Sequence, residues 1–584
     1  MKRIIRQILG WGMMLTLPLM MTSCGELFDM LDNPITPALQ VLRAQLTLKV
    51  GESKPIQAST QAHVVLLYSS DNPAVATVDA TGLITAVSPG TARITIKAQG
   101  EDDYYRTEIF SENTTTVEVT VTKKDGSITF ATSTVIKSFG DDAFTNPLTI
   151  VGDGTVTYSS NNSNVATVDA NGNVSIIDGG TAIITATTAN TDEYAYKPDY
   201  AQYTLRVIKI IDLSTLTSDY IAQDNNILTG TLAGNYKITI ADNANVELKD
   251  VTINGGNNSS TNWAGLTCDG NATITISGTN TVMGFYYKYP GIQAGKTGTT
   301  LTINGTGTLT ATGGDFAAGI GSGYDGASCG HITISGGTVN ASSSMNGASI
   351  GSGFKGSSCG AITISGGTVN ASSASNGAGI GSGYANSSCG NITISGGTVN
   401  ASSASNGAGI GSGFSGSSCG AITISGGTVN ANTRYGAGIG SGYKNSSCKN
   451  ITISGGTVIA SSGDAGAGIG SGFNGSSCGN ITISGGTVTA SSGLDGAGIG
   501  SGQNSSYGSV TITSGITKVQ ATTNYMDVWP IGKGYSDLGS TGAVTIDKVT
   551  VTGRDWDGTG LSGTGLTLTG AGTNTWTLTS TTTP

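Results

Sequence analysis

Six cysteines recur at an almost constant interval and limit what this chain can fold into. The successive intervals are 30, 30, 30, 29 and 30 residues. A period this constant indicates a repeat protein in which each unit packs only on its neighbours. The six residues are Cys329, Cys359, Cys389, Cys419, Cys448 and Cys478.

One repeat unit shows short alternating segments separated by glycine pairs. Ile392 and Ile394 flank Thr393, and residues 398–402 alternate in the same way. This alternation predicts short strands with one apolar face, and the Gly-Gly and Ser-Gly pairs predict tight corners. Three short strands per coil without helices predict a parallel β-helix, right-handed as parallel crossovers nearly always are.

A single coil cannot fold alone. Its large aliphatic side chains contribute roughly 6 to 12 kcal/mol on burial, whereas ordering its backbone and side chains costs on the order of 30 kcal/mol or more. Stacking supplies the missing hydrogen bonds, so like residues should form ladders along the axis. About eleven coils at about 4.8 Å each are expected over residues 212–584, with the irregular segments 212–233 and 551–584 covering the ends. The expected ladders are Ile320, Ile350, Ile380, Ile410, Ile439, Ile469 and Ile499 inside, and Asn340, Asn370, Asn400 and Asn430 near a corner.

The first residues have the order of an export signal. Basic residues precede an apolar run from Ile8 to Met21 that glycine and proline interrupt, and this run is too short for a membrane span. Thr22-Ser23-Cys24 resembles the lipobox of bacterial lipoproteins, which implies removal of residues 1–23 and acylation of Cys24. We therefore expect a linker at 24–43 and a surface-exposed protein of the outer membrane, with its acyl chains as the only contact with the membrane. The alternative is an ordinary secretory signal with an incidental cysteine.

Two segments before the repeat are similar to each other. Residues 69–79 read Ser-Ser-Asp-Asn-Pro-Ala-Val-Ala-Thr-Val-Asp, a Gly-Thr-Ala segment follows, and residues 159–185 keep this pattern. Short alternating strands between Asn, Asp and Gly turns predict β-sandwiches. The motifs resemble the bacterial immunoglobulin-like domains of group 2, found in invasin- and intimin-like adhesins. This resemblance implies two such domains, at 44–123 and 127–209, that act as a stalk.

Charged side chains that could carry catalysis are scarce in the repeat. Between 332 and 500 the only acids are Asp464 and Asp495, so neighbouring coils do not form the carboxylate pairs that β-helical lyases and hydrolases need. His63 and His331 stand singly and are interpreted as surface residues. The acidic flanks 242–269 and 547–557 could hold a site but show no recognisable spacing, and the acidic loops 101–105 and 192–196 are interpreted as solvated rather than calcium-binding.

These observations predict a chain that is not an enzyme and has no cofactor and no metal site. A formal net charge of −10 without a basic stripe also argues against nucleic acid as a partner. Each coil offers one thiol and no nearby histidine, which does not fit a zinc site. We expect an inward stack of thiols that pack as small hydrophobes, with occasional disulfides between coils as the alternative.

Aromatic residues offer two candidate surfaces. One aromatic residue per coil follows the inward isoleucine by four positions, an even number, which in a continuous strand places both side chains on the same face. This favours packing in the core or at a corner over binding. These residues are Tyr324, Phe354, Tyr384, Phe414, Tyr443 and Phe473. Before them, Trp263, Tyr289 and Phe316 should share one corner of three successive coils, enlarged by an insertion containing Tyr286 and Tyr287. This cluster is the candidate glycan-binding site, and packing against the second immunoglobulin-like domain or the cap is an equal alternative.

The repeated Gly-Ile-x-Ser-Gly and Ile-Thr-Ile-Ser-Gly-Gly-Thr-Val segments, over residues 246–546, resemble β-helical carbohydrate-binding proteins and repeat adhesins. We therefore expect an all-β, monomeric lipoprotein with two immunoglobulin-like β-sandwiches and a right-handed parallel β-helix. It would act as an adhesin or glycan-binding protein toward a polysaccharide or a glycan of a host or partner cell. The alternatives are a polysaccharide lyase or glycoside hydrolase with a divergent site, and a structural spacer without a ligand.

Overall fold

The computed structural model describes most of the chain from residue 36 onward, and strand β1 (Leu39–Val41), within the predicted linker 24–43, pairs with β4 (Ala58–Thr60). The described residues are 36–60, 64–100, 111–255, 260–536, 542–547, 549–551 and 565–581. The predicted signal peptide, Cys24, His63 and the 101–105 loop therefore lie outside them. Within these ranges, no helix has the length and apolar character needed to cross a bilayer.

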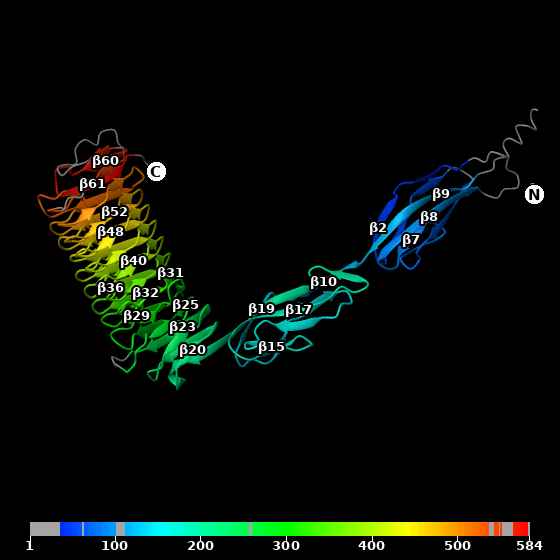
Figure 1. The fold of residues 1–584 in the computed structure, drawn as a ribbon, viewed down its shortest axis with the longest axis horizontal. Coiled ribbons are helices and arrows are strands. Elements are labelled where there is room, and N and C mark those ends of the chain that lie inside the picture. Colours follow the sequence, from blue (N-terminus) through cyan, green and yellow to red (C-terminus); the bar gives the residue numbers. More distant parts are fainter. Residues whose placement is uncertain are drawn as a thin grey trace, which may run out of the picture. The chain divides into compact units, whose positions relative to one another are not determined.

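The chain divides into two compact units (Figure 1). The first unit contains the residues up to 135 together with 142–175 and 182–205. The second contains 136–141, 176–181 and everything from 206 onward.

The first unit begins with a β-sandwich, as the sequence predicts. Buried side chains from two sheets, among them Ile84, Ile94 and Val119, form one core. One sheet has the order β2 (Gln45–Lys49), β9 (Asn113–Thr122), β8 (Gly90–Gly100) and β5 (Val64–Ser70), and the other has the order β3 (Ser53–Pro55), β7 (Leu83–Ala86) and β6 (Ala76–Val78).

The repeated Val-Asp motif forms the same turn in both immunoglobulin-like segments. The Asp79 carboxylate accepts hydrogen bonds from the backbone N–H groups of Thr81 and Leu83, both at 2.9 Å. Asp169 does the same for the residues at 171 and 173. An aspartate that satisfies two backbone donors fixes a tight turn between strands, which explains why the motif occurs twice.

The second immunoglobulin-like segment contains two three-stranded sheets and a set of longer strands. Residues 192–196, predicted as a solvated loop, instead include strand β18, and Glu193 forms an ion pair with Lys124. The small sheets are β13 (Leu148–Val151), β10 (Lys124–Phe130) and β18 (Tyr194–Tyr196), and β12 (Phe144–Thr145), β16 (Asn173–Ile176) and β15 (Ala166–Val168). The longer strands follow in the order β11 (Thr134–Ser138), β14 (Thr157–Ser160), β17 (Gly180–Thr187) and β19 (Tyr200–Asp212).

The second unit is a parallel β-solenoid of about ten turns, close to the predicted eleven. Each central coil has four strands, where the sequence predicted three. In one coil they are β37 (Ile380–Gly381), β38 (Ser388–Cys389), β39 (Ile392–Ile394) and β40 (Thr398–Ser403). The additional strand is the two-residue Ser-Cys segment, which pairs with its counterparts in neighbouring coils.

Identical residues lie over one another, as the thirty-residue period predicts. Ile380 pairs with Ile410 and Cys389 with Cys419. The isoleucine ladder is fully buried, at 0% exposure. Where the interval shortens to 29 residues, Ile410 still pairs with Ile439, so the corner absorbs the missing residue and the register is kept.

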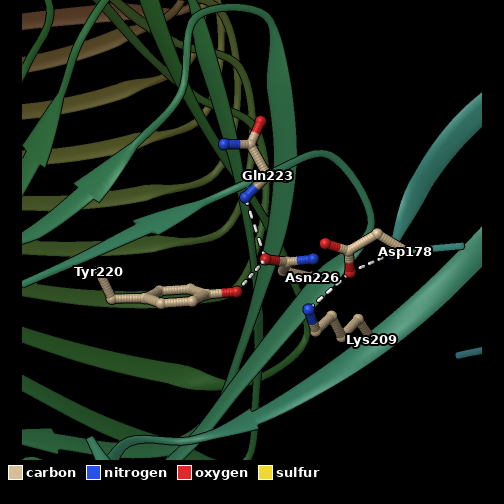
Figure 2. A network of polar contacts seen from close by, with 6 residues as sticks. Asp178, Lys209, Tyr220, Gln223 and Asn226 are labelled. Carbon is tan, nitrogen blue, oxygen red and sulfur yellow. Dashed lines mark hydrogen bonds and ion pairs between the residues drawn. The ribbon is translucent and has the colours of Figure 1, made fainter. Parts of the chain in front are cut away.

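The beginning of the solenoid departs from the prediction. Residues 212–233 were expected to form an irregular cap, but they contain β20 (Tyr220–Ala222) and β21 (Asn226–Thr231), which pair in parallel with the next coil. Strand β19 also enters the stack, because its last four residues pair in parallel with β21. Polar contacts fix this first coil (Figure 2): Asn226 Oδ1 accepts hydrogen bonds from the Tyr220 hydroxyl and the Gln223 N–H, and Lys209 donates to Asp178 at 2.5 Å.

Antiparallel strands cover the end of the solenoid, where residues 551–584 were expected to form an irregular cap. Strand β56 (Lys518–Thr522) of the last coil pairs antiparallel with β61 (Thr575–Ser580), which pairs with β60 (Leu566–Thr569). Trp576 on β61 is fully buried in the solenoid core. An antiparallel strand that covers the last coil prevents the open edge of the sheet from pairing with another chain.

Candidate functional site

One aromatic ring per coil stacks into a continuous ladder, which we call the aromatic ladder. Its regular part is nearly parallel: ring centroids are 4.9 Å apart from Phe354 to Tyr384, 5.0 Å from Tyr384 to Phe414 and 5.1 Å from Phe414 to Tyr443. The interplanar angles fall from 20° to 8° toward its end. The members are Tyr324, Phe354, Tyr384, Phe414, Tyr443 and Phe473.

The aromatic ladder lies at a surface corner and not in the core. Each of its six residues is half-buried, whereas the isoleucine four positions earlier is fully buried. Of the two positions expected from the sequence, the corner is confirmed and the core is wrong. Gly381, which separates Ile380 from Tyr384, has a φ of +140°, and this conformation interrupts the strand alternation on which parity depends.

A second ladder, of asparagine amides, borders the aromatic ladder. Asn376 Nδ2 donates to Asn346 Oδ1 at 2.8 Å, and Asn406 Nδ2 donates to Asn376 Oδ1 at 2.7 Å. The backbone N–H of Tyr384 binds the carbonyl oxygen of Asn346 at 2.9 Å, so the two ladders are neighbours. The sequence predicts only the other asparagine ladder. The structure confirms its stacking, with Asn400 donating to Asn370 at 2.8 Å, but places it within strands such as β40 and not near a corner as expected.

The predicted glycan-binding cluster divides between the core and the aromatic ladder. Trp263 packs on Phe285 with centroids 5.7 Å apart, and Phe285 is only 1% exposed. The indole Nε1 of Trp263 is buried without a hydrogen-bond partner among the described residues. Trp263 therefore packs on the core of the solenoid itself, whereas the alternative interpretation placed it against the second immunoglobulin-like domain or the cap.

The remaining members extend the aromatic ladder toward the start of the solenoid. Tyr287 meets Phe316 at 5.4 Å, edge to face, and Phe316 meets Phe354 at 5.3 Å. Tyr286 lies 4.1 Å from Tyr287. It is Tyr287, and not Tyr289 as predicted, that pairs with Phe316, because the Phe316 N–H binds the Tyr287 carbonyl oxygen. Tyr289 instead closes the turn of the insertion, with its N–H on the Tyr286 carbonyl oxygen at 2.9 Å.

Lysine side chains lie over this first part of the ladder. Lys288 Nζ is 5.4 Å from the ring centroids of both Tyr287 and Tyr324. Lys355 Nζ is 5.6 Å from the Tyr324 ring and 3.1 Å from Asp325 Oδ1. The hydrogen bond with Asp325 raises the pKa of Lys355 above its ordinary value. The raised pKa keeps Lys355 cationic at neutral pH. Lys288 and Lys355 thus place two basic side chains at this end of the ladder.

The stacking geometry decides which part of each ring can meet a ligand. Ring faces in the regular part cover one another, so the half-exposed surface of each residue is its edge. Aromatic edges carry the positive part of the ring quadrupole and suit contacts with hydroxyl oxygens. The stack of rings ends at Phe473, because Gln503 takes the equivalent position in the next coil.

Asp242 and His331, from the segments where a catalytic site was considered, both accept hydrogen bonds from the backbone. Asp242 accepts the N–H of Asn271 at 2.7 Å, and His331 Nδ1 accepts the N–H of Ala361 at 2.9 Å. Each bond satisfies a backbone donor one coil later, at a corner where the strand ladder is interrupted. Within the described ranges, no three His, Cys, Asp or Glu side chains group closely enough to hold a metal ion.

The six repeat cysteines form the predicted inward ladder. They are 1% to 7% exposed, and each thiol after the first lies near a carbonyl oxygen of the preceding coil, as Cys389 Sγ does at 3.8 Å from Gly360 O. Hydrogen bonding with the thiols of Cys329 and Cys389, together with burial, raises the pKa of Cys359 well above its ordinary value. Burial raises the pKa of Cys268, outside this ladder, to about 12.

We expect the buried thiols to stay unreactive toward the disulfide reagent DTNB at pH 8 in the native protein and to react after denaturation. The thiolate is the reactive form, and the raised pKa values keep it scarce. Because unfolded thiols ionise near pH 8.5 while the folded ones do not, the free energy of unfolding should fall as the pH rises above this value. Stoichiometric labelling of the native protein at pH 8 would contradict the buried ladder.

Family comparisons agree with this architecture. Residues 35–107 match the bacterial Ig-like domain (group 2), and residues 150–190 match the intimin immunoglobulin-like domain. The beta helix repeat matches seven segments, at 301–324, 332–354, 362–384, 392–414, 422–443, 451–473 and 481–503. No curated protein matches the sequence.

Three of the similar solved structures each cover 30% of this chain. Domains 4 and 5 of the S-layer protein SbsC share 17% identity over 30% of this chain and 99% of theirs, with a TM-score of 0.18. Human protocadherin-24 EC1-2 shares 15% over 30% of this chain and 99% of its own, with a TM-score of 0.16. Drosophila N-cadherin EC1-4 shares 11% over 30% of this chain, which spans only 50% of that structure, with a TM-score of 0.16.

These TM-scores are too low to support any inference about fold or function. The family matches and the geometry agree, however, on the order of the parts. The chain carries bacterial immunoglobulin-like domains followed by β-helix repeats, an organisation that indicates a surface-exposed, adhesin-like bacterial protein.

Proposed function

We propose that this protein is a lipid-anchored, non-catalytic adhesin of the outer membrane that binds a glycan along the aromatic ladder. The observation that carries the proposal is the continuous row of half-exposed rings bordered by asparagine amides. Ring edges and amides together suit a ligand rich in hydroxyl groups. The candidate site is therefore the aromatic ladder with Tyr286, Tyr287 and Phe316 at its start.

A solenoid surface suits binding by many weak contacts. Each half-exposed ring edge offers one weak contact, and the same contact recurs in every coil of the ladder. A ligand that follows the axis can therefore bind without a deep pocket. Between Phe354 and Tyr443 the ladder itself carries no carboxylate, which supports a binding surface rather than the acid and base of a hydrolase.

A glycan-array screen of the purified protein tests this proposal. We expect retention of at least one glycan, weakened about tenfold by Tyr384→Ala combined with Phe414→Ala, because two ring contacts are lost. Ser395→Ala is the matched control, since this exposed side chain lies at another corner of the same coil. Circular dichroism and urea unfolding should show that the double variant keeps its fold.

The outcomes separate three kinds of protein. Retention without new reducing or unsaturated ends supports the adhesin. Accumulation of such ends in the incubated polysaccharide would instead identify a lyase or hydrolase. A protein that retains no glycan at all would be a spacer, and undiminished retention by the double variant would place the site elsewhere on the molecule.

A further inference from the structure

The aromatic ladder has a period of two coils rather than one. Phenylalanine and tyrosine alternate without exception along it, in the order Tyr324, Phe354, Tyr384, Phe414, Tyr443, Phe473. A second alternation accompanies the last four. Two positions after Tyr384 and Tyr443 stand Asn386 and Asn445, and two positions after Phe414 and Phe473 stand Gly416 and Gly475. The chemical repeat of this surface is therefore about sixty residues.

Packing explains the alternation of asparagine and glycine. A Cβ atom added at Gly416 would lie 2.3 Å from Asn386 Oδ1, and one at Gly475 would lie 2.3 Å from Asn445 Oδ1. Each asparagine side chain thus lies over the glycine of the next coil. A side chain at either glycine would have to displace this asparagine, so packing accounts for a glycine next to each of the two asparagines.

Packing does not explain the alternation of tyrosine and phenylalanine. The rings stack at nearly the same distance and angle whichever residue is present: Tyr384 to Phe414 is 5.0 Å at 16°, and Phe414 to Tyr443 is 5.1 Å at 15°. Within the described part of the chain, no hydrogen bond is found for the hydroxyl groups of Tyr384 and Tyr443. These hydroxyls are attached to half-exposed rings and are available to a ligand.

The spacing of these hydroxyls selects a class of ligand. Two steps of the ladder separate the Tyr384 and Tyr443 rings by about 10 Å, as two coils of about 4.8 Å require. In an extended β-1,4-linked glycan, each sugar is turned over relative to the previous one, so equivalent hydroxyl groups recur at every second sugar. A glycan chain that lies parallel to the solenoid axis then presents an equivalent hydroxyl group to each tyrosine hydroxyl.

We propose that the ladder recognises a linear β-linked glycan in register, with one disaccharide unit for every two coils. This inference rests on the proposed function and adds the orientation and the repeat of the ligand. It predicts preference for extended chains over chains that wind into a helix, because only an extended chain keeps its repeat aligned with the tyrosines. The probes are cellohexaose, which is β-1,4-linked, and maltohexaose, which is α-1,4-linked.

Two variants with the same composition test the register. The clustered variant, Phe414→Tyr with Tyr443→Phe, places two tyrosines in adjacent coils. The phase-shifted variant, with Tyr384→Phe, Phe414→Tyr, Tyr443→Phe and Phe473→Tyr, keeps the two-coil alternation over these four coils. We expect the clustered variant to bind cellohexaose about three- to tenfold more weakly than the phase-shifted variant, the loss of one hydrogen bond, as measured by calorimetry on the full chain.

The outcomes separate this inference from the function on which it rests. Equal affinities of the two variants for cellohexaose would contradict the proposed match of one disaccharide to two coils. Tighter binding of maltohexaose than of cellohexaose by the wild type, or binding of neither, would also contradict it. If the wild type retains glycans on the array and Tyr384→Ala with Phe414→Ala weakens this retention, the proposed function stands in each of those cases. If no glycan is retained on the array, the function and the register both fall.

Discussion

Replacement of Gly381 by alanine is expected to destabilise the solenoid by roughly 2 to 6 kcal/mol, from backbone strain and overlap together. Gly381 has a φ of +140°, and a Cβ atom there would lie 1.7 Å from the carbonyl oxygen of Gly411 in the next coil. Because that contact is with backbone, no side chain can move aside. The midpoint of urea unfolding, followed by circular dichroism, measures the effect.

Gly356→Ala is the matched control for this substitution. Gly356 also has a positive φ, of +70°, but no atom lies within 4 Å of a Cβ added there. Only the left-handed conformation is penalised, by roughly 1 to 2 kcal/mol. Equal shifts of the unfolding midpoint in the two variants would contradict the close backbone approach between coils.

Removal of one coil should be tolerated, whereas removal of half a coil should not. Deletion of residues 380–409 joins Gly379 to Ile410, the residue that pairs with Ile380 in the intact stack, so every ladder continues in register. Deletion of residues 380–394 joins Gly379 to Ser395 and places polar residues where isoleucines belong. This mismatch removes the apolar burial of about one coil, which lowers the free energy of unfolding by roughly 6 to 12 kcal/mol.

Size-exclusion chromatography and urea unfolding distinguish these two deletions. The one-coil deletion should elute as a folded monomer with an unfolding midpoint near that of the wild type, since each coil contacts only its neighbours. The half-coil deletion should unfold at lower urea concentration or aggregate. Two deletions of equal stability would show that the thirty-residue period is not the structural unit.

The inner ladders could be predicted from the sequence because they depend only on the period and on strand alternation. Ile392 and Ile394 alternate with Thr393, and this alternation holds in the structure without a break. The thiol ladder followed from the same period. A constant interval determines which residues stack whatever the path between them, and even the 29-residue interval did not change the pairing.

The position of the aromatic ladder could not be predicted by the same means. Counting from Ile380 to Tyr384 assumes an unbroken strand, but Gly381 leaves the strand conformation. The neighbouring asparagine ladder also gave no signal, because Asn346 lies in a loop where alternation carries no information. The insertion before Tyr289 shifted the pairing to Tyr287 for a similar reason, since a loop of changed length has no fixed parity.

The most direct measurement of the stacked repeat is a pulsed electron paramagnetic resonance distance along one column. Thr333 and Thr511 lie in the same column and are six coils apart. Spin labels at these two positions, in a Cys24→Ser background, should be about 29 Å apart at about 4.8 Å per coil. The deletion of residues 380–409 should shorten this distance by about one coil, to about 24 Å. A distance that does not shorten, or that lies far from these values, would contradict the stacking of one coil per thirty residues.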